Sequence, residues 1–246
     1  MKEENSAPGI LYLVATPIGN LSDMTPRGVD TLKLADVVAA EDTRHSRILF
    51  ERFGVSPKKL VSYHAHNVER RTPELERALQ DGLSVALISD AGTPGISDPG
   101  YALVSAAVRI GARICPIPGA SSPVMAVAAS GFPSHRFVYE GFLPRKKGRK
   151  TIIESWKDEK RTVVFLESPH RIVKTLRDIA GYIGERMVCV AREMTKVHEE
   201  FIRGRVSQVA DRIEKSGAAR GEITVALAPE RAGGRWEEQG LEEEGD

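Results

Sequence analysis

The sequence has few cysteines and no long apolar run. Only Cys115 and Cys189 occur among 246 residues, which leaves neither a disulfide framework nor a zinc site built from cysteines. Both lie in short apolar runs, so we expect buried thiols. No stretch approaches the roughly 18 apolar residues of a membrane helix, and residues 1–9 lack the basic and apolar parts of an export signal. These absences predict a cytoplasmic protein without a membrane contact.

Three glycine-containing motifs are also missing. The sequence has no G-x-G of a dinucleotide site, no phosphate-binding G-x-x-x-x-G-K-[ST], and no G-x-S-x-G around a nucleophilic serine. These absences disfavour a nucleotide or sugar-phosphate enzyme. His64 and His66 are two residues apart, but no third ligand follows at a recognisable spacing, so a surface loop is favoured and no metal is expected.

The near-zero net charge is the sum of two unlike parts. The formal net charge of the whole chain is +1. Residues 237–246 hold six carboxylates and no Lys or Arg, which leaves 35 basic against 28 acidic residues, or +7, on residues 1–236. We therefore expect an acidic disordered tail, and a body whose charge suits a polyanionic partner.

Short apolar runs alternate with helical periodicity in the first half. Runs of strand length occupy residues 10–15, 37–40, 60–63, 85–89 and 113–117. Between them, Thr25-Pro26 and Asp98-Pro99 are expected to begin helices, with the first residue as the N-cap and the proline at the first helical position. The alternation predicts an α/β domain with a mostly parallel five-stranded sheet, covered by helices on both faces.

The second half has a different order of elements. Residues 131–149 contain several Pro and Gly residues and end in a basic run, which is typical of a domain junction. After them we expect helices at 150–156, 169–183 and 206–215 and strands at 163–167, 187–192, 200–203 and 222–226. Two consecutive strands indicate a mixed sheet. The chain is therefore divided into a flexible N-terminus at 1–9, an N-terminal α/β domain at 10–118, a C-terminal α/β domain at 119–228 and the acidic tail at 229–246.

Polar and glycine-rich loops follow the predicted strands. Open α/β sheets bind ligands at the carboxyl ends of their strands, so these loops are well placed for a small molecule. In the densest loop, 89–100, Asp90 offers a carboxylate and Gly92 allows a ligand to approach the backbone. A turn before a capped helix explains residues 98–100 but not Asp90. For Ser121 and Ser122, and for residues 41–44, a capped helix start and a ligand contact remain open alternatives.

Charged groups gather at two places in the second half. Residues 192–200 combine acid, base and hydroxyl groups just after a predicted strand, and 145–150 form a basic run. A solvated loop is the alternative for the first and a solvated linker for the second.

Taken together, these loops resemble the class III S-adenosylmethionine-dependent methyltransferases, the tetrapyrrole methylase superfamily, and within it the branch that methylates ribosomal RNA. The matching segments are VATPIGNL (14–21), AEDTR (40–44), SDAGTPGISDPG (89–100), PGAS (118–121), FLESPHR (165–171), REMTK (192–196), HE (198–199) and GE (221–222). Tetrapyrrole-specific members carry G-x-G-x-G-D in the first loop. TPIGN at 16–20 departs from it and favours the RNA branch.

The resemblance implies two α/β domains with S-adenosylmethionine in the cleft between them, and a homodimer. It places the cofactor against residues of both domains: Thr16, Pro17, Ile18, Gly19, Asp90, Gly92, Thr93, Pro94, Ala120, Ser121, Ser122, Leu166, Met194, Gly221, Glu222, Ile223 and Thr224. The implied reaction is 2'-O-methylation of a cytidine ribose in 16S rRNA of the small ribosomal subunit.

Methyl transfer to a 2'-hydroxyl needs the hydroxyl oxygen aligned with the sulfonium methyl group, and a group that accepts the hydroxyl proton. We expect Glu193, with Lys196 or His198 beside it, to supply the base and a nearby cation, and the alternates are Glu41, Asp42, Arg44 and Glu167. Basic side chains that collect phosphates are expected to contact the RNA, namely Arg44, Arg145, Lys146, Lys147, Arg149 and Lys150. The remaining alternatives are a methyltransferase of the same fold that acts on a tetrapyrrole or a protein side chain, and a non-catalytic RNA-binding module.

Overall fold

A computed structural model of the chain describes residues 7–217 and 220–230. Most of the expected flexible N-terminus and nearly all of the acidic tail lie outside the described residues. Contacts within the chain divide it into two units, Met1–Ser121 and Ser122–Asp246. The sequence had placed this boundary after residue 118. Within the described residues, no helix is long and apolar enough to cross a lipid bilayer.

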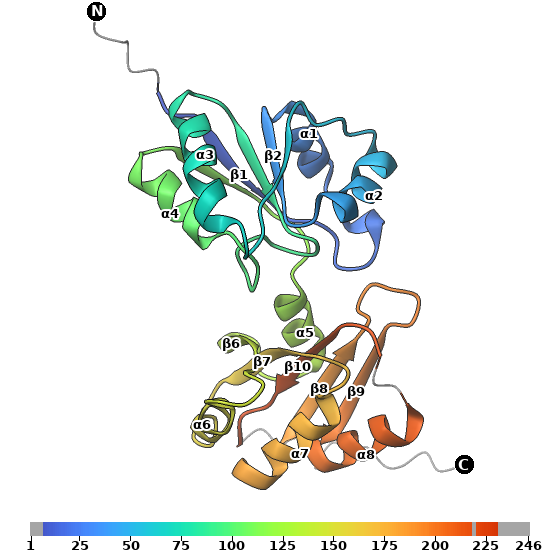
Figure 1. The fold of residues 1–246 in the computed structure, drawn as a ribbon. Helices are drawn as coiled ribbons and strands as arrows, with labels where there is room; N and C mark the ends of the chain where they lie inside the picture. Colours follow the sequence, from blue (N-terminus) through green and yellow to red (C-terminus); the bar gives the residue numbers. More distant parts are fainter. Residues whose placement is uncertain (1–6, 218–219, 231–246) are drawn as a thin grey trace, which may run out of the picture. The chain divides into compact units, whose positions relative to one another are not determined.

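The first unit is built on a sheet of five parallel strands in the order β3-β2-β4-β1-β5 (Figure 1). The strands are β1 (Ile10–Val14), β2 (Val37–Ala40), β3 (Leu60–Ser62), β4 (Val85–Ile88) and β5 (Arg113–Ile117). The helices are η1 (Leu21–Asp23), α1 (Pro26–Leu34), α2 (Thr43–Phe53), α3 (Val68–Gln80) and α4 (Tyr101–Arg109). The five predicted strands are confirmed to within one residue at each end.

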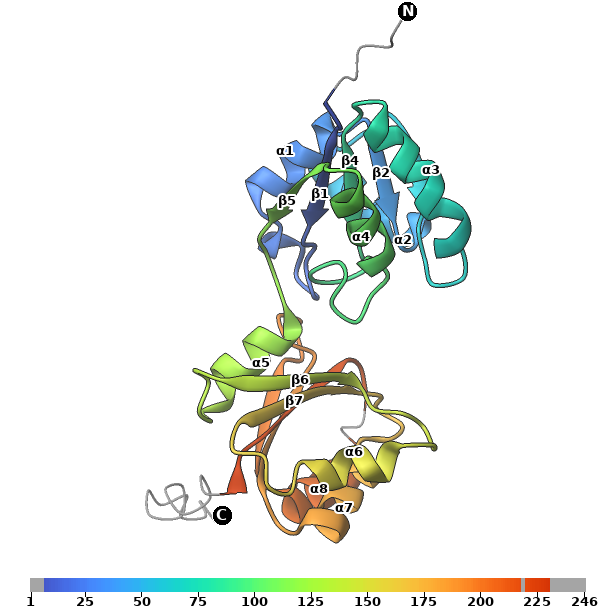
Figure 2. The ribbon, with the colours of Figure 1, turned by 90° about the vertical axis from the view of Figure 1, so that its left-hand side faces the viewer.

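Alternate residues of the central strands face opposite helical layers. Val37 and Ala39 of β2 belong to the core under α3 and α4, whereas Val38 and Ala40 belong to the core under α1 and α2. Figure 2 shows these helix pairs on either side of the sheet. Because both faces are covered, the central strands β2 and β4 are continuously apolar, as the sequence indicated.

Two helix starts with a capping residue followed by proline were predicted in the first unit, and one is correct. Thr25 caps α1 by accepting a hydrogen bond from the Gly28 N–H at 3.1 Å, with Pro26 as the first helical residue. The start at Asp98 is wrong, since α4 begins at Tyr101. The chain before α4 folds back on itself, so that a Cβ on Gly100 would lie 2.8 Å from the Gly95 Cα. Because α4 begins only after this turn, Asp98 lies in the loop and not at the start of the helix.

The second unit contains a mixed sheet in the order β6-β7-β10-β8-β9. Its strands are β6 (Phe137–Phe142), β7 (Thr162–Glu167), β8 (Met187–Arg192), β9 (Glu200–Arg205) and β10 (Ile223–Leu227). Its helices are α5 (Ser122–Ser130), α6 (Arg149–Ser155), α7 (Ile172–Ile183) and α8 (Val206–Ser216). β6 and β7 are parallel and the other pairs are antiparallel, which confirms the mixed sheet.

Helices cover both faces of this sheet. The larger core lies under α6, α7 and α8, where the rings of Trp156 and Phe165 stack with centroids 5.3 Å apart. α5 packs on the other face, where Val127 contacts the core around Cys189. Cys189 is buried as predicted, and burial raises the pKa of its thiol to about 11. Cys115 lies on the edge strand β5 and is only partly buried, so the prediction is wrong for that residue.

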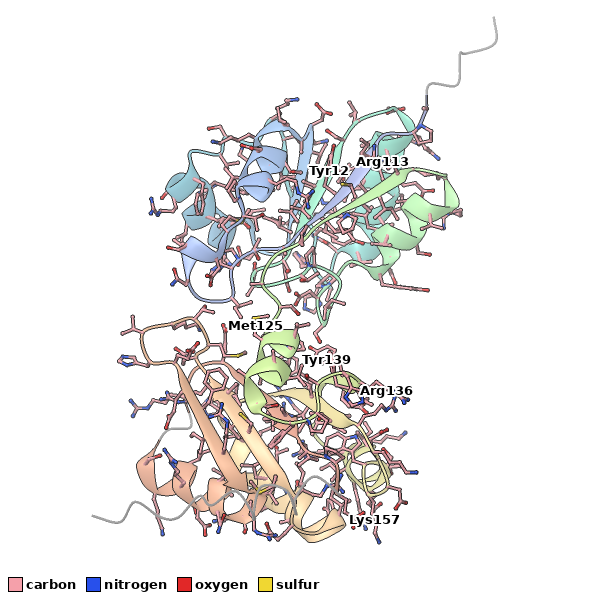
Figure 3. All side chains as sticks on the ribbon, turned by 180° about the vertical axis from the view of Figure 1, so that it is seen from behind. Tyr12, Arg113, Met125, Arg136, Tyr139 and Lys157 are labelled. Atoms are coloured by element: carbon pink, nitrogen blue, oxygen red, sulfur yellow. The ribbon has the colours of Figure 1, made fainter. Side chains whose placement is uncertain are left out.

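The domain junction predicted at 131–149 is wrong. β6 lies within that stretch, inside the second unit, and pairs with β7. The strand is hard to recognise because it combines Glu140 and Gly141 with a register shift between Tyr139 and Phe142. Figure 3 shows Tyr139 on this strand, with Met125 on the neighbouring α5.

Candidate functional site

The loops after β1 and β4 are tied together at the carboxyl edge of the first sheet. The Thr16 N–H donates to the Gly92 carbonyl at 2.9 Å, and the Gly92 N–H donates to the Thr16 carbonyl at 3.0 Å. The Thr16 hydroxyl also donates to the Ser89 carbonyl at 3.2 Å. Gly92 has a φ of +83°, a conformation that favours glycine. Ile18 is buried, and its Cγ2 lies 3.4 Å from the place of a Cβ on Gly92.

The loop after β5 joins the same edge. The Thr93 hydroxyl donates to the Ala120 carbonyl at 3.2 Å. Gly119 packs so closely on the end of β1 that a Cβ there would lie 2.8 Å from the Ala15 Cβ. The structure therefore brings together the predicted cofactor residues Thr16, Gly92, Thr93 and Ala120 through main-chain and hydroxyl contacts.

Three carboxylates belong to this edge as well, and one of them is Asp98, which was predicted to be a helix cap. The Asp90 N–H donates to Glu41 Oε2 at 3.3 Å, and the Asp42 N–H donates to Asp90 Oδ1 at 3.0 Å. Burial raises the pKa of Glu41. Burial, together with the charges of Glu41 and Asp90, raises the pKa of Asp98 to about 6. We call Glu41, Asp90 and Asp98 the acid cluster. A positively charged ligand would stabilise its ionised form.

Asp42 and Arg44 form a helix start, which is one of the two interpretations left open for residues 41–44. The Asp42 carboxylate accepts from the Arg44 N–H at 2.8 Å and caps α2. The Arg44 guanidinium donates to the same carboxylate at 2.8 and 3.2 Å and holds the pKa of Asp42 well below its usual range. The Arg44 side chain is 86% exposed.

In the second unit, Glu193, Lys196 and Glu222 form one hydrogen-bonded group. Lys196 Nζ donates to Glu193 Oε1 at 2.8 Å and lies 3.4 Å from Glu222 Oε2. The Glu222 N–H donates to the same Glu193 Oε1 at 2.9 Å, and the Glu193 N–H donates to the Glu222 carbonyl at 2.9 Å. β8 and β10 are antiparallel, with Arg192 opposite Ile223, so the residues after β8 meet those before β10. Among the described residues, none donates a hydrogen bond to Glu193 Oε2.

An unusual backbone positions Glu193. Glu193 and Thr195 have φ values of 52° and 66°, in the left-handed region that residues other than glycine rarely adopt. The Thr195 N–H donates to Glu199 Oε2 at 2.7 Å. Gly221 has a φ of +75°, and a Cβ there would overlap the Glu193 side chain. Strained positions of this kind persist where the surrounding structure determines them, and they cluster at functional sites.

The electrostatics keep Glu193 and Lys196 oppositely charged. The hydrogen bonds from Lys196 and from the Glu222 N–H lower the pKa of Glu193. Burial lowers the pKa of Lys196, but the Glu193 and Glu222 carboxylates outweigh burial and raise it overall. His198 lies exposed in the same loop.

The remaining predicted cofactor residues of the second unit lie on or beside its central strands. Leu166 of β7 pairs with Thr224 of β10, and Ile223 is the first residue of β10. Met194 follows β8 and is 7% exposed. These residues line the ends of neighbouring strands, beside the Glu193 group.

A buried charged cluster surrounds Glu167 at the end of β7. Arg171 Nη2 lies 2.7 Å from Glu167 Oε1, and Arg149 Nη1 lies 3.4 Å from Oε2. The Thr175 hydroxyl donates to Oε2 at 2.7 Å, and Arg149 Nε pairs with Asp178 at 3.2 Å. Glu167 was predicted as an alternate site residue, whereas Thr175 and Asp178 were not predicted from the sequence. Glu167 ends a strand and Arg171 precedes α7, so helical spacing could not predict their pairing.

Arg149 differs from the other basic residues of the run at 145–150. It is 7% exposed, and its partners occupy its guanidinium. Its burial removes Arg149 from the surface on which an RNA contact would form, which corrects the sequence expectation for this residue. The other members of the set, Arg145, Lys146, Lys147 and Lys150, are exposed.

Comparison with known proteins extends these observations. Residues 10–210 match the family described as Tetrapyrrole (Corrin/Porphyrin) Methylases. The chain is 48% identical over 220 residues to the ribosomal RNA small subunit methyltransferase I of Thermotoga maritima, covering 89% of this chain and 98% of that protein.

Solved structures show the same fold. A diphthine synthase aligns with a TM-score of 0.67 at 16% identity, covering 89% of this chain and 90% of that one. A uroporphyrin-III C-methyl transferase from Thermus thermophilus, complexed with S-adenyl homocysteine, aligns with a TM-score of 0.61 at 21% identity, covering 89% and 97%.

Proposed function

The chain belongs to the tetrapyrrole methylase family, and from this premise we propose that it 2'-O-methylates a cytidine ribose in 16S rRNA of the small ribosomal subunit, with S-adenosylmethionine as the methyl donor. One observation carries the proposal: the 48% identity to a ribosomal RNA small subunit methyltransferase I, over 98% of the length of that relative. The first loop supports it, because TPIGN at 16–20 lacks the glycine-rich sequence of the tetrapyrrole enzymes.

The acid cluster fits this cofactor, which carries sulfonium and ammonium charges. Burial and mutual repulsion raise the pKa values of Glu41 and Asp98, which means that their negative charge is destabilised. A cationic ligand would offset this destabilisation and would be attracted to the ionised carboxylates. When bound, the cofactor supplies a methyl group activated by its sulfonium. We assign it Thr16, Pro17, Ile18, Gly19, Asp90, Gly92, Thr93, Pro94, Ala120 and Ser121 in the first unit, and Ser122, Leu166, Met194, Gly221, Glu222, Ile223 and Thr224 in the second.

Glu193 takes the role of proton acceptor. As the 2'-oxygen bonds the methyl carbon and the carbon–sulfur bond breaks, the hydroxyl proton becomes strongly acidic and needs only a weak base. The Lys196 ammonium and the Glu222 N–H hold Glu193 Oε1, and Oε2 receives the proton. The lowered pKa keeps Glu193 ionised at neutral pH and ready to accept it. His198 in the same loop is the alternative acceptor.

The protein acts as a homodimer in the cytoplasm in this proposal. The family resemblance implies a dimer, and α4 exposes the apolar side chains of Tyr101 (82%) and Val108 (63%). Light scattering after gel filtration tests the dimer, and Tyr101→Asp is expected to shift it toward the monomer. A monomer for the unaltered chain would contradict this part.

A methylation assay on small subunits tests the reaction. Subunits from cells that lack the protein should accept labelled methyl groups as 2'-O-methylcytidine at one 16S rRNA position, whereas subunits from unaltered cells should not. Glu193→Gln should lose at least roughly 100-fold in kcat while calorimetry shows retained cofactor binding. Methylation of a porphyrinoid but not of subunits would refute the proposed substrate. Full turnover by Glu193→Gln would refute the proton acceptor.

A further inference from the structure

An arginine-lined hollow lies in the second unit, beside the Glu193 group. It has a volume of about 490 Å³ and is lined by Arg192, Glu200, Arg212, Ser216, Gly217 and Arg220. These residues come from the end of β8, the start of β9, helix α8 and the segment before β10. β9 and α8 pack against each other (Figure 1). We call this feature the arginine hollow.

The arginine hollow has more positive charge than its one carboxylate can compensate. Arg192 Nη2 lies 3.0 Å from Glu200 Oε2, and Arg212 Nη2 lies 3.5 Å from Glu200 Oε1. Within the described part of the chain, Arg220 makes no ion pair. Two guanidinium groups therefore share one carboxylate while the third has none, and the planar donor geometry of guanidinium suits the oxygens of a phosphate.

The backbone connects the arginine hollow to the proposed proton acceptor. Arg192 directly precedes Glu193, and Arg220 directly precedes Gly221 and Glu222. The Glu193 N–H binds the Glu222 carbonyl at 2.9 Å, which holds the two segments together. In a ribonucleotide, the 2'-hydroxyl and the 3'-phosphate are attached to neighbouring carbons of one ribose. A phosphate in the arginine hollow would therefore place a ribose near Glu193.

We propose that the arginine hollow binds a backbone phosphate of the substrate RNA, at or next to the target nucleotide. This inference rests on the proposed function and names a subsite for its substrate. The Arg192 side chain is 17% exposed and forms the buried side of the hollow, while Arg212, at 63%, and the exposed Arg220 lie on its solvent side, where a phosphate would enter. The arginine hollow is separate along the chain from the basic run at 145–150.

Charge removal tests the subsite. The double variant Arg212→Gln and Arg220→Gln is measured by fluorescence anisotropy with a single-stranded RNA oligonucleotide of arbitrary sequence over a salt series. Affinity at low salt should fall by roughly tenfold. The slope of log K against log salt should become shallower by about 0.7 for each lost contact. Arg177→Gln is the matched control, because Arg177 is an exposed arginine of α7 paired with Glu214, outside the hollow, and it should change neither quantity.

Removal of the negative charge from the arginine hollow should strengthen RNA binding. Glu200→Gln removes the one carboxylate that Arg192 and Arg212 share, so RNA affinity should rise and the salt slope should steepen. A purely structural role for the arginines does not predict this rise. In the methylation assay, the double variant should raise KM for subunits and leave cofactor binding unchanged by calorimetry.

Several outcomes would overturn the subsite. One is that the Arg212→Gln, Arg220→Gln double variant binds the oligonucleotide with the affinity and the salt slope of the unaltered chain. Another is a lost affinity for assembled subunits with an unchanged affinity for the oligonucleotide, which would assign the arginine hollow to a ribosomal protein. In both cases methylation by the unaltered chain would leave the proposed function standing. If the unaltered chain fails to methylate subunits, the proposed function fails, and the anisotropy series still decides whether the hollow binds phosphate.

Discussion

Gly221 decides where the carboxylate of Glu193 lies. Its φ of +75° is costly for any other residue, and a Cβ would overlap the Glu193 side chain. Gly221→Ala should therefore displace Glu193 and reduce kcat by at least roughly 100-fold, while the free energy of unfolding falls by only about 1–2 kcal/mol. Kinetics and thermal unfolding measure the two effects.

Gly54→Ala is the matched control for this prediction. Gly54 ends α2 with a φ of +60°, and a Cβ there would meet nothing within 4 Å. It should show a similar loss of stability with unchanged kcat. An equal kcat for both variants would mean that the position of Glu193 does not matter for the reaction.

Asp98 should make stability depend on pH. Its pKa in the folded protein is raised to about 6, so the folded state binds the proton more tightly than the unfolded state does. The stability from this group is present below its ordinary pKa and is lost as the pH rises through 6. Asp98→Asn should therefore raise the unfolding free energy of the cofactor-free protein by about 1–2 kcal/mol at pH 7.5, with no gain near pH 3.

Asp36 offers a control of opposite sign. Hydrogen bonds from Lys58 and Ser84 lower its pKa, so its contribution is present at neutral pH and is lost in acid. Asp36→Asn should lower the melting temperature at pH 7.5, and the loss should shrink as the pH falls. If both variants move the melting temperature in the same direction at pH 7.5, the raised pKa of Asp98 is refuted.

At the residue scale, the sequence identified residue types better than their environments. Glu193 and Lys196 were predicted to act together, and they share a hydrogen bond of 2.8 Å. Asp98 was assigned to a helix cap, because a cap and a buried acid have the same local sequence. What separates them is the proximity of Glu41, more than fifty positions away along the chain.

The basic run at 145–150 combines a structural arginine with exposed basic residues. Arg149 pairs with Glu167 at 3.4 Å and with Asp178 at 3.2 Å, whereas Lys147 is exposed. Arg149→Met leaves two carboxylates without this partner and should cost about 3–5 kcal/mol of stability. Lys147→Met should leave the melting temperature unchanged and make the salt slope of RNA binding shallower. A stable Arg149→Met variant with weakened RNA binding would return Arg149 to the RNA surface.

At the element scale, periodicity predicted the fully buried strands and missed β6, one of the partly exposed edge strands. The strands β2 and β4 are apolar throughout because helices cover both of their faces. β6 is an edge strand with partly exposed residues, Glu140 among them, and an irregular register. Apolar periodicity identifies a strand through its burial, so an edge strand with a bulge carries too little of that signal.

At the scale of the molecule, the distribution of charge matters more than its sum. The net +1 combines +7 on residues 1–236 with six carboxylates on 237–246. In the second unit, the exposed residues at 145–147 and the arginine hollow concentrate part of the positive charge. Both regions are expected to meet RNA, and an acidic segment on the same chain is a competing anion for them.

Removal of the last ten residues tests this competition. Residues 237–246 lie outside the described residues, and the expected effect follows from their charge alone. Their deletion should leave kcat unchanged, and RNA affinity at low salt should be equal or higher, because a competing polyanion is lost. A second variant, in which the six carboxylates become Gln or Asn, separates charge from length and should behave like the deletion. Weaker RNA binding in both variants would show that the acidic residues support the complex, and the +7 of the body would then not suffice to hold the RNA.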